Sequence, residues 1–342
     1  MQRRITVPGF LHDEAGNLAD RGYATSLLLK YDRDRVKANH LRLKEWDYYY
    51  IGNDNFGLAL TVADNGYMSM DSISFLDFGK NHQSTDSRMR FLGKRRGLPL
   101  TSAQGDIRAQ GKDYDITFLN DGKTRQLYGH MDNFGKGKTI LFDITLTDAP
   151  RDSMVIVTPF AGKSRAFYYN QKINCMRAEG KVALDGREYL FSPATAFGVL
   201  DWGRGVWTYD NTWYWGSASG IAQGHRFGFN IGCGFGDTSA ASENMLFYDG
   251  IAHKLSRVAF NIPTKNGRED YLSPWTFTSD DGRFEMNFSP ILDRSARINL
   301  KLLLSDQHQV FGRFSGRAVL DDGTPIQVKD LTGFAEKVHN KW

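Results

Sequence analysis

The residue types best suited to chemistry gather near the middle of the chain, in residues 200–215. Four of the seven tryptophans fall there: Trp202, Trp207, Trp213 and Trp215. An indole ring buries a large apolar area, carries one N–H donor and attracts cations to its face. Such a cluster suits the wall of an apolar ligand cavity or the seam between two domains. We expect Trp202 and Trp207 at a seam. We expect Trp213 and Trp215, which share one strand face, at a cavity.

Two charged residues accompany these tryptophans. Asp201 and Arg204 can pair with each other or across a domain seam, because the rigid guanidinium fork of arginine matches a carboxylate. A structural ion pair is favoured over a catalytic role. We therefore group Asp201, Trp202, Arg204 and Trp207 as structural residues between two domains.

A glycine-rich stretch follows at residues 227–237. Alternation places Phe227, Phe229 and Ile231 on one strand face, and Asn230 on the other among glycines 228, 232 and 234. A glycine face lets a ligand or another backbone approach closely. Asn230 is a lone polar group there, and Asn244 follows on the next expected strand. The predicted ligand-binding residues are therefore Trp213, Trp215, Asn230 and Asn244.

A proton donor in an apolar cavity would make such a site catalytic. Burial raises the pKa of a carboxyl group, so that the group stays protonated and can donate. The candidates are Asp210, Asp237, Glu243 and Asp249, with Tyr248 to orient one of them. Each is also a plausible turn residue, and Asp249-Gly250 in particular is typical of a hairpin turn. Trp213 and Trp215 would stabilise a developing carbocation.

Three functions stay open at this point. One is binding of a small hydrophobic molecule without chemistry, in a cavity that lacks a buried carboxyl group. Another is a lyase or isomerase, of hydratase or cyclase type, with a buried carboxyl group as proton donor. The third is a scaffold whose interiors are filled by side chains. The sequence leaves open whether there is any catalysis, because it does not say which strand faces point inward.

Strands must position these residues. In residues 113–118 and 140–147 apolar and polar side chains alternate, which is typical of half-buried antiparallel strands. Asp-Gly and Asn-Gly pairs separate such runs, as hairpin turns require. The best short helix candidates are residues 32–39 and 331–339. The pattern predicts an all-β protein with few short helices.

An internal repeat indicates two units. The run Gly180 to Gly186 resembles the run Gly316 to Gly323, and the two copies end at Trp207 and Trp342. Units of this size suit closed antiparallel barrels, because closure removes exposed strand edges. We predict two tandem lipocalin-like barrels, residues 1–198 and 199–342, with a ligand in a barrel cavity or at the seam between the barrels.

Composition narrows the partners. The net charge is +4, and the basic run Lys94-Arg95-Arg96 is expected to be a solvated loop rather than a nucleic-acid patch. The start of the chain lacks the apolar core of a signal peptide, and no run is long enough for a transmembrane helix, so we expect a cytoplasmic protein without a membrane segment. The eight histidines form no local metal motif, and we predict no metal and no cofactor.

The same residues carry a family resemblance. Asp201-Trp-Gly-Arg-Gly-Val-Trp207, Trp213-Tyr-Trp215 and Asn230-Ile-Gly-Cys-Gly-Phe235 resemble the bacterial domain-of-unknown-function 2804 family, as do Lys172-Ile-Asn-Cys175 and residues 333–342. The family is similar in organisation to two-domain lipocalin-like proteins, among them carotenoid hydratases and tocopherol-cyclase-like proteins. The resemblance implies an apolar, isoprenoid, lipid or polyketide-like ligand, and it places no catalytic motif on this chain.

Overall fold

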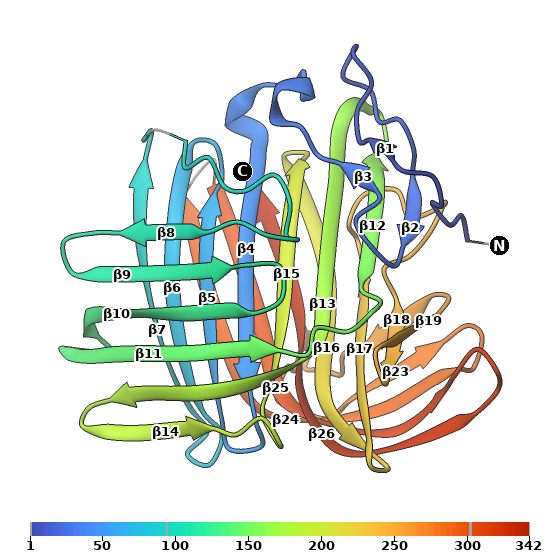
Figure 1. Ribbon diagram of the computed structural model, residues 1–342. Helices are drawn as coiled ribbons and strands as arrows, with labels where there is room; N and C mark the ends of the chain where they lie inside the picture. Colours follow the sequence, from blue (N-terminus) through green and yellow to red (C-terminus); the bar gives the residue numbers. More distant parts are fainter. Residues whose placement is uncertain (1, 94, 301–302, 342) are drawn as a thin grey trace.

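The computed structural model describes residues 2–93, 95–300 and 303–341, and most of these residues belong to β-strands (Figure 1). Lys94 and Trp342, which the sequence patterns above include, lie outside the described residues. Most strands belong to two large sheets, one for each half of the chain. The prediction of an all-β chain is confirmed.

The first sheet has thirteen strands, and its main order is β7-β6-β5-β4-β15-β13-β11-β10-β9-β8. Its strands are β2 (Gly22–Ala24), β4 (Leu43–Gly52), β5 (Phe56–Asp64), β6 (Met68–Asp77), β7 (His82–Phe91), β8 (Ile107–Gln110), β9 (Tyr114–Asn120), β10 (Arg125–Phe134), β11 (Lys138–Thr147), β12 (Met154–Phe160), β13 (Lys163–Leu184), β14 (Arg187–Phe191) and β15 (Phe197–Val206). The long β13 also pairs with β12 and β14, and β12 pairs with β2.

The second sheet has nine strands in the order β19-β18-β17-β16-β26-β25-β24-β23-β20. Its strands are β16 (Asp210–Ala222), β17 (His225–Cys233), β18 (Met245–Tyr248), β19 (Ile251–Lys254), β20 (Val258–Asn261), β23 (Trp275–Ser279), β24 (Phe284–Leu300), β25 (Leu303–Val319) and β26 (Pro325–Lys341). Two small sheets complete the fold, formed by β1 (Gly9–Phe10) with β3 (Leu29–Lys30), and by β21 (Thr264–Lys265) with β22 (Arg268–Glu269).

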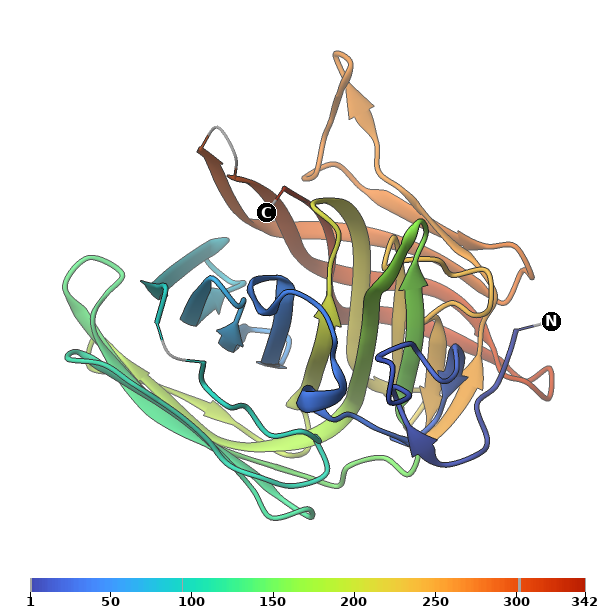
Figure 2. The same ribbon diagram turned by 90° about the horizontal axis from the view of Figure 1, so that it is seen from above.

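The repeated glycines mark the points where long strands bend. Gly180 in β13 and Gly316 in β25 have φ angles of +139° and +156°, a region that side chains disfavour. A Cβ atom at either position would lie 2.2 Å from a carbonyl oxygen of the neighbouring strand, that of Asp143 or Glu285. Each bend curls its sheet, so that each half of the chain forms a strongly curved half-barrel (Figure 2). Tandem lipocalin-like architecture is confirmed.

Three details differ from the sequence predictions. In the described part of the chain neither barrel is closed by hydrogen bonds, because β7 and β8 remain the ends of the first sheet, and β19 and β20 those of the second. Residues 331–339 lie in strand β26 rather than in a helix. Residues 32–39 contain the 3₁₀ helix η1 (Arg33–Arg35), and η2 (His40–Arg42) follows it.

The change from one sheet to the other falls between β15 and β16. Strand β15 pairs with β4 and β13 of the first sheet, so the predicted boundary at residues 198/199 lies inside that strand. None of the helices in the described ranges is long and apolar enough to cross a membrane.

The two barrels pack against each other through β13, which contacts β16 and β17 (Figure 2). The glycine face of β17 makes this approach possible, because a Cβ atom at Gly228 would lie 2.4 Å from the Sγ atom of Cys175 on β13. The opposite face of β17 fills the second barrel with Phe227, Phe229 and Ile231, all fully buried. The alternation read from residues 227–232 is therefore present in the structure.

Candidate functional site between the two barrels

The contact face between the barrels, here called the seam, is lined by alternate side chains of β4, β13 and β15 on one side and of β16, β25 and β26 on the other. Its centre is polar although it is buried. Lys172 on β13 is 1% exposed, and its strand register places it beside Asp201 on β15. Two more acids, Glu243 and Glu336, complete a group of four that we call the seam cluster.

The ammonium group of Lys172 contacts two of the acids in the seam cluster. Lys172 Nζ lies 3.0 Å from Asp201 Oδ1 and 4.0 Å from Glu243 Oε2. Asp201 Oδ1 also accepts a hydrogen bond of 2.6 Å from Asn170 Nδ2. Asp201 is thus both ion-paired and hydrogen-bonded. The seam cluster thus holds three carboxyl groups around one lysine.

Glu243 is the acid with the fewest partners. Its residue is 3% exposed, and neither of its carboxyl oxygens accepts a hydrogen bond of normal geometry. Burial, with the charge of Asp201, raises the pKa of Glu243 to about 7, and the charge of Lys172 and the side chain of Asn230 only partly oppose this. Near neutral pH this carboxyl group therefore exists in both protonation states, as a proton donor or acceptor must.

Glu336 on β26 is buried nearby but is held by hydrogen bonds. Its two oxygens accept bonds from Trp213 Nε1 at 3.0 Å and from Gln309 Nε2 at 2.9 Å. Burial again raises the pKa of the carboxyl group to about 7, while the bond from Trp213 and the charge of Arg294 lower it. Glu336 is therefore better restrained than Glu243.

Aromatic rings surround the ammonium group. Lys172 Nζ lies 4.1 Å from the ring centroid of Trp215 and 5.8 Å from that of Phe235. The Phe235 ring stacks on Tyr168 with centroids 4.8 Å apart. The Tyr168 hydroxyl group is buried without a hydrogen-bond partner, and burial together with the charge of Glu243 raises its pKa. The seam is thus apolar in its walls and acidic at its centre.

Two asparagines hold the segment that carries Glu243. Asn230 accepts a hydrogen bond from Trp215 Nε1 at 2.7 Å and donates one to the Glu243 carbonyl oxygen at 2.8 Å. Asn244 accepts from the Gly232 backbone N–H and donates to the Ser256 carbonyl oxygen. Both predicted ligand-binding asparagines thus contact protein groups through both ends of their amides, and they position the acid.

The structure separates the four residues predicted to lie between the domains. Asp201 and Trp207 are in the seam, where Trp207 packs on Trp213 with centroids 5.1 Å apart. Trp202 and Arg204 point the other way, into the first barrel, where Trp202 packs on Tyr31 and Tyr169. Asp201 and Arg204 do not pair, because residues an odd number of positions apart lie on opposite strand faces.

Both tryptophans expected at a cavity, Trp213 and Trp215, lie in the seam, next to Glu336 and Lys172 respectively.

Most of the predicted acids lie elsewhere. The side chains of Asp210 and Asp249 are 53% and 49% exposed, and each contacts a histidine on the surface. Tyr248 stacks on one of these, His225. Asp237 accepts a hydrogen bond from the Ser239 backbone in a turn. Of the acids considered from the sequence as proton donors, Glu243 alone belongs to the seam cluster.

Sequence patterns missed two members of the seam cluster. Lys172 shares a strand face with Asn170 and Asn174, so one face of this buried strand carries polar residues at every second position, although Gln171 on the other face is polar too. This alternation was a usable indication of a buried polar face. Glu336 lies in the segment that we predicted as a helix, and a helical reading hides which neighbours the residue faces.

A second buried charged group lies inside the first barrel and is called the barrel cluster: Glu45, Asp47, Arg33, Arg95 and Arg204. Glu45 is fully buried and lies 3.0 Å from Arg33 Nη2 and 3.1 Å from Arg95 Nη2. Arg204 Nη2 lies 3.0 Å from Asp47 Oδ1.

The loop around residues 95–99 supplies two arginines that pair with buried carboxylates. Arg95 belongs to the barrel cluster, and Arg96 forms a short ion pair with the fully buried Asp71. The prediction of a solvated basic loop is therefore wrong for Arg95 and Arg96. Their guanidinium groups turn inward because buried carboxylates at the end of the barrel require partners.

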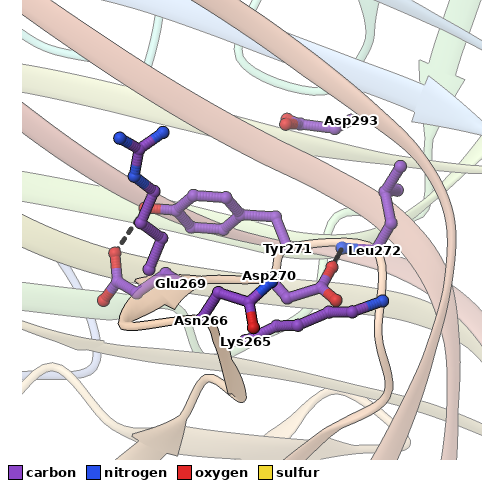
Figure 3. Close-up of a pocket in the computed structure, with 8 residues that line it drawn as sticks. Lys265, Asn266, Glu269, Asp270, Tyr271, Leu272 and Asp293 are labelled. Carbon is purple, nitrogen blue, oxygen red and sulfur yellow. Dashed lines mark hydrogen bonds between the residues drawn. The ribbon is translucent and has the colours of Figure 1, made fainter.

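One hollow in the described surface lies away from the seam cluster. It has a volume of about 550 Å³ and is lined by residues around β21 and β22, including Glu269, Tyr271 and Asp293 (Figure 3). Glu269 pairs with Lys337 at 2.6 Å, and Asp293 with His308 at 2.6 Å. Two carboxylates of this hollow are thus paired with basic groups of neighbouring strands, which is typical of a structural surface network. Within the described ranges no group of three or more metal-ligating side chains is placed to hold a metal ion.

Comparison with known proteins supports the architecture. A search of curated proteins found no match to this sequence. Kievitone hydratase from Nectria haematococca has a similar structure, with a TM-score of 0.53 and 13% identity, over 96% of this chain and 98% of that one. A protein described as AttH from Nitrosomonas europaea gives a TM-score of 0.52 and 13% identity, over 90% and 96% of the two chains.

At this level of identity the two likenesses show the fold alone. In sequence, the model of one family matches residues 2–342, and the chain therefore belongs to that family, which is described as domain of unknown function (DUF2804).

Proposed function

We propose that the seam binds a small hydrophobic molecule and acts on it as a lyase of hydratase type, with Glu243 as general acid and Asp201 as general base. The ligand class is the one expected from the sequence, isoprenoid, lipid or polyketide-like. Trp213, Trp215, Tyr168 and Phe235 would pack against its apolar body. A cytoplasmic location and the absence of a nucleic-acid partner stay predictions.

One observation carries the proposal: Glu243 is a buried carboxyl group whose cation partner, Lys172, lies 4.0 Å away, whose oxygens accept no hydrogen bond of normal geometry, and whose pKa is raised to about 7. A structural carboxylate in an interior is normally paired and hydrogen-bonded, because burying an unpaired charge is costly. A general acid works best when its pKa lies near the operating pH. A carrier without chemistry would not need this acid.

The neighbouring carboxyl group suits the opposite role. Asp201 is paired with Lys172 and accepts a hydrogen bond from Asn170. Two carboxyl groups in unlike environments are a recurrent arrangement of acid and base. In the elimination direction, Asp201 takes a proton from a carbon atom, and the electron pair of that C–H bond forms a C=C bond. The adjacent C–O bond breaks, and the leaving oxygen takes the proton of Glu243 and departs as water. Hydration is the reverse.

The position of Lys172 changes the role expected for the tryptophans. Its ammonium group already occupies the vicinity of the Trp215 ring, so a carbocation on that face would meet a like charge. The acid–base route avoids a full cation, and we therefore assign Trp215 to packing against the ligand. A ligand oxygen near Lys172 would also gain a hydrogen-bond donor.

The test begins with the ligand. The protein is purified from its native host and extracted with organic solvent, and the extract is identified by mass spectrometry. The extracted compound is then returned to the protein in D₂O. We expect deuterium at carbon and a mass change of one water with the wild-type chain. Glu243→Gln should bind the compound with unchanged Kd but lose at least about 100-fold in rate, the usual contribution of a general acid.

The matched control is Glu179→Gln, because Glu179 is an exposed glutamate on the same strand β13 as Lys172. This variant should keep the wild-type rate. Undiminished turnover in Glu243→Gln would overturn the proposal. Binding without turnover in the wild-type chain would favour a carrier, and a ligand-free protein that binds no apolar probe would favour a scaffold with filled interiors.

A further inference from the structure

A second, smaller hollow opens at the other end of the seam, and we call it the tail pocket. It has a volume of about 180 Å³ and is lined by both barrels, through Tyr50 and Val199 on one side and Ser217, Gly220 and Thr332 on the other. At its mouth, Thr332 Oγ1 donates a hydrogen bond of 2.7 Å to Asp54 Oδ1, which joins the β4–β5 turn to β26. The tail pocket therefore lies between the two sheets.

Strand register connects the tail pocket to the seam cluster. Tyr50 pairs with Val199 and Tyr48 with Asp201, while Ser217 pairs with Phe334 and Trp215 with Glu336. The tail pocket is thus two residues further along each strand than the seam cluster, a step of about 7 Å. A molecule one or two rings long spans such a step.

The wall of the tail pocket contains an unpartnered polar group. Tyr50 is 7% exposed, and its hydroxyl group is buried without a hydrogen-bond partner. Two glycines make room for this side chain, since a Cβ atom at Gly52 would lie 2.2 Å from the Tyr50 hydroxyl oxygen, and one at Gly57 would lie 2.7 Å from the ring. The rings of Phe311 and Phe334 pack on Tyr50 at 5.2 and 5.6 Å.

A second polar atom without a hydrogen-bond partner lies near the opposite wall, on Asn174, which contacts Ser217. Asn174 donates hydrogen bonds to Ser217 Oγ at 2.8 Å and to the Phe229 carbonyl oxygen at 3.1 Å, but its own amide oxygen is buried and accepts none. A buried polar atom without a partner is costly in a folded protein and is rare unless it serves a ligand or water. Of these two atoms, the Tyr50 hydroxyl group belongs to the lining of the tail pocket, and it offers a ligand an unused hydrogen-bonding group there.

We propose that the tail pocket holds a ring-sized apolar group that carries one hydroxyl or carbonyl oxygen, bonded to the Tyr50 hydroxyl group. The volume agrees with this size, since an apolar cavity of about 150 Å³ accommodates a benzene ring. Where the proposed function holds, this group is the far end of the same ligand whose reactive carbon lies at Glu243. The ligand class is then a cyclic molecule with an oxygen substituent at the end remote from the reacting bond.

Binding of two small probes tests the tail pocket without any need for turnover. Ligand-observed NMR titrations compare p-cresol, which has a ring and a hydroxyl group, with toluene, which has only the ring. We expect saturable binding of both to the wild-type chain, with p-cresol tighter. Tyr50→Phe should weaken p-cresol binding about fivefold, as the loss of one hydrogen bond does, and leave toluene unchanged.

A blocking variant locates the binding. Ala194 is an exposed residue at the mouth of the tail pocket, so Ala194→Trp covers the mouth without disturbing the interior. It should weaken both probes at least tenfold. The matched control Lys123→Trp, at an exposed turn of the first barrel, should bind as the wild-type chain does.

The proposal is overturned if p-cresol fails to bind the wild-type chain, or if Ala194→Trp binds it equally well. Equal loss of p-cresol and toluene in Tyr50→Phe would remove the hydrogen bond from the proposal. Glu243→Gln should bind both probes normally, so failure of the tail pocket and failure of the acid at Glu243 give different results.

Discussion

The two buried charged clusters of this protein differ in how their charges are balanced. In the barrel cluster both oxygens of Glu45 accept hydrogen bonds, from Tyr31, Arg33 and Arg95. In the seam cluster both oxygens of Glu243 lack hydrogen-bond partners, and one lysine serves several acids. Both are buried to a similar degree. Burial alone therefore does not distinguish Glu45 from Glu243, whereas the hydrogen bonds that their oxygens accept do.

The choice of cation explains part of the difference. Arginine offers a planar fork of donors that can satisfy two carboxylates at fixed angles, and it stays charged. Lys172 offers a compact charge at the end of a flexible chain, which leaves neighbouring acids free to change protonation state. Even in the barrel cluster burial raises the pKa of Asp47, but Arg204 opposes that shift through both its charge and a hydrogen bond.

The largest expected effect is in the barrel cluster. Arg204→Met removes the fully buried partner of Asp47 and leaves uncompensated buried charge, so the free energy of unfolding should fall by about 3–5 kcal/mol. Urea unfolding followed by far-UV circular dichroism measures this. The control Arg297→Met, at a side chain 70% exposed, should change stability by less than about 0.5 kcal/mol. A loss below about 1 kcal/mol in Arg204→Met would contradict a structural role.

The next largest effect is expected from overpacking in the seam. A Cβ atom at Gly232 would lie 2.4 Å from Glu243 Oε1, so Gly232→Ala must displace the acid. We expect a loss of about 1–3 kcal/mol from overpacking, together with a changed pKa of Glu243. Gly93→Ala is the control, because a Cβ atom there meets no neighbour within 4 Å. An unchanged Glu243 titration in Gly232→Ala would show that the acid is less confined than the structure indicates.

The third prediction is that the seam cluster and the barrel cluster affect the free energy of unfolding differently as the pH changes. The pKa of Glu243 is about 7 in the folded chain and 4.5 in its ordinary range, so ionisation in the folded state opposes folding. As pH rises from about 4.5 to about 7, wild type should lose stability relative to Glu243→Gln, by up to about 1.4 kcal/mol per pH unit. The groups facing this acid are Lys172, Asp201 and Lys254, and burial lowers the pKa of Lys254 to about 7.

The matched change in the barrel cluster should have the opposite sign. Glu45→Gln removes a charge that Arg33 and Arg95 bind, so this variant should be less stable than wild type at neutral pH. Unfolding curves of all three chains between pH 4.5 and 8 measure both effects. Parallel behaviour of the two glutamine variants would mean that the clusters do not differ as described.

The smallest effect concerns Glu336. Trp213→Phe removes the N–H group that donates to Glu336 Oε1, a bond that lowers the pKa of this acid. The pKa of Glu336 should therefore rise above its value of about 7, with a stability loss of about 1 kcal/mol for the lost hydrogen bond. Carbon-13 NMR titration of the glutamate carboxyl groups resolves the shift. A lower pKa in the variant would contradict the assigned role of Trp213.

Local patterns predicted much of the fold, because the side-chain alternation and the turn residues that specify strands and hairpins involve only residues close together in the sequence. The alternation at residues 227–232 and the Asp-Gly turns each involve residues a few positions apart. The same logic failed at residues 331–339, where Leu331, Phe334, Ala335 and Val338 have helical spacing but lie in β26. There pairing with β16 and β25 overrides the local pattern.

The sequence by itself determined the fold class, the curvature at Gly180 and Gly316, and which side chains share a strand face. Only the tertiary structure decided which face became the seam and which acids met there. Lys172, Asp201, Glu243 and Glu336 come from β13, β15, a loop and β26, and no local pattern relates them. The charged groups of the seam cluster lose their water when the two curved sheets pack together, because this packing buries the side chains on both contact faces.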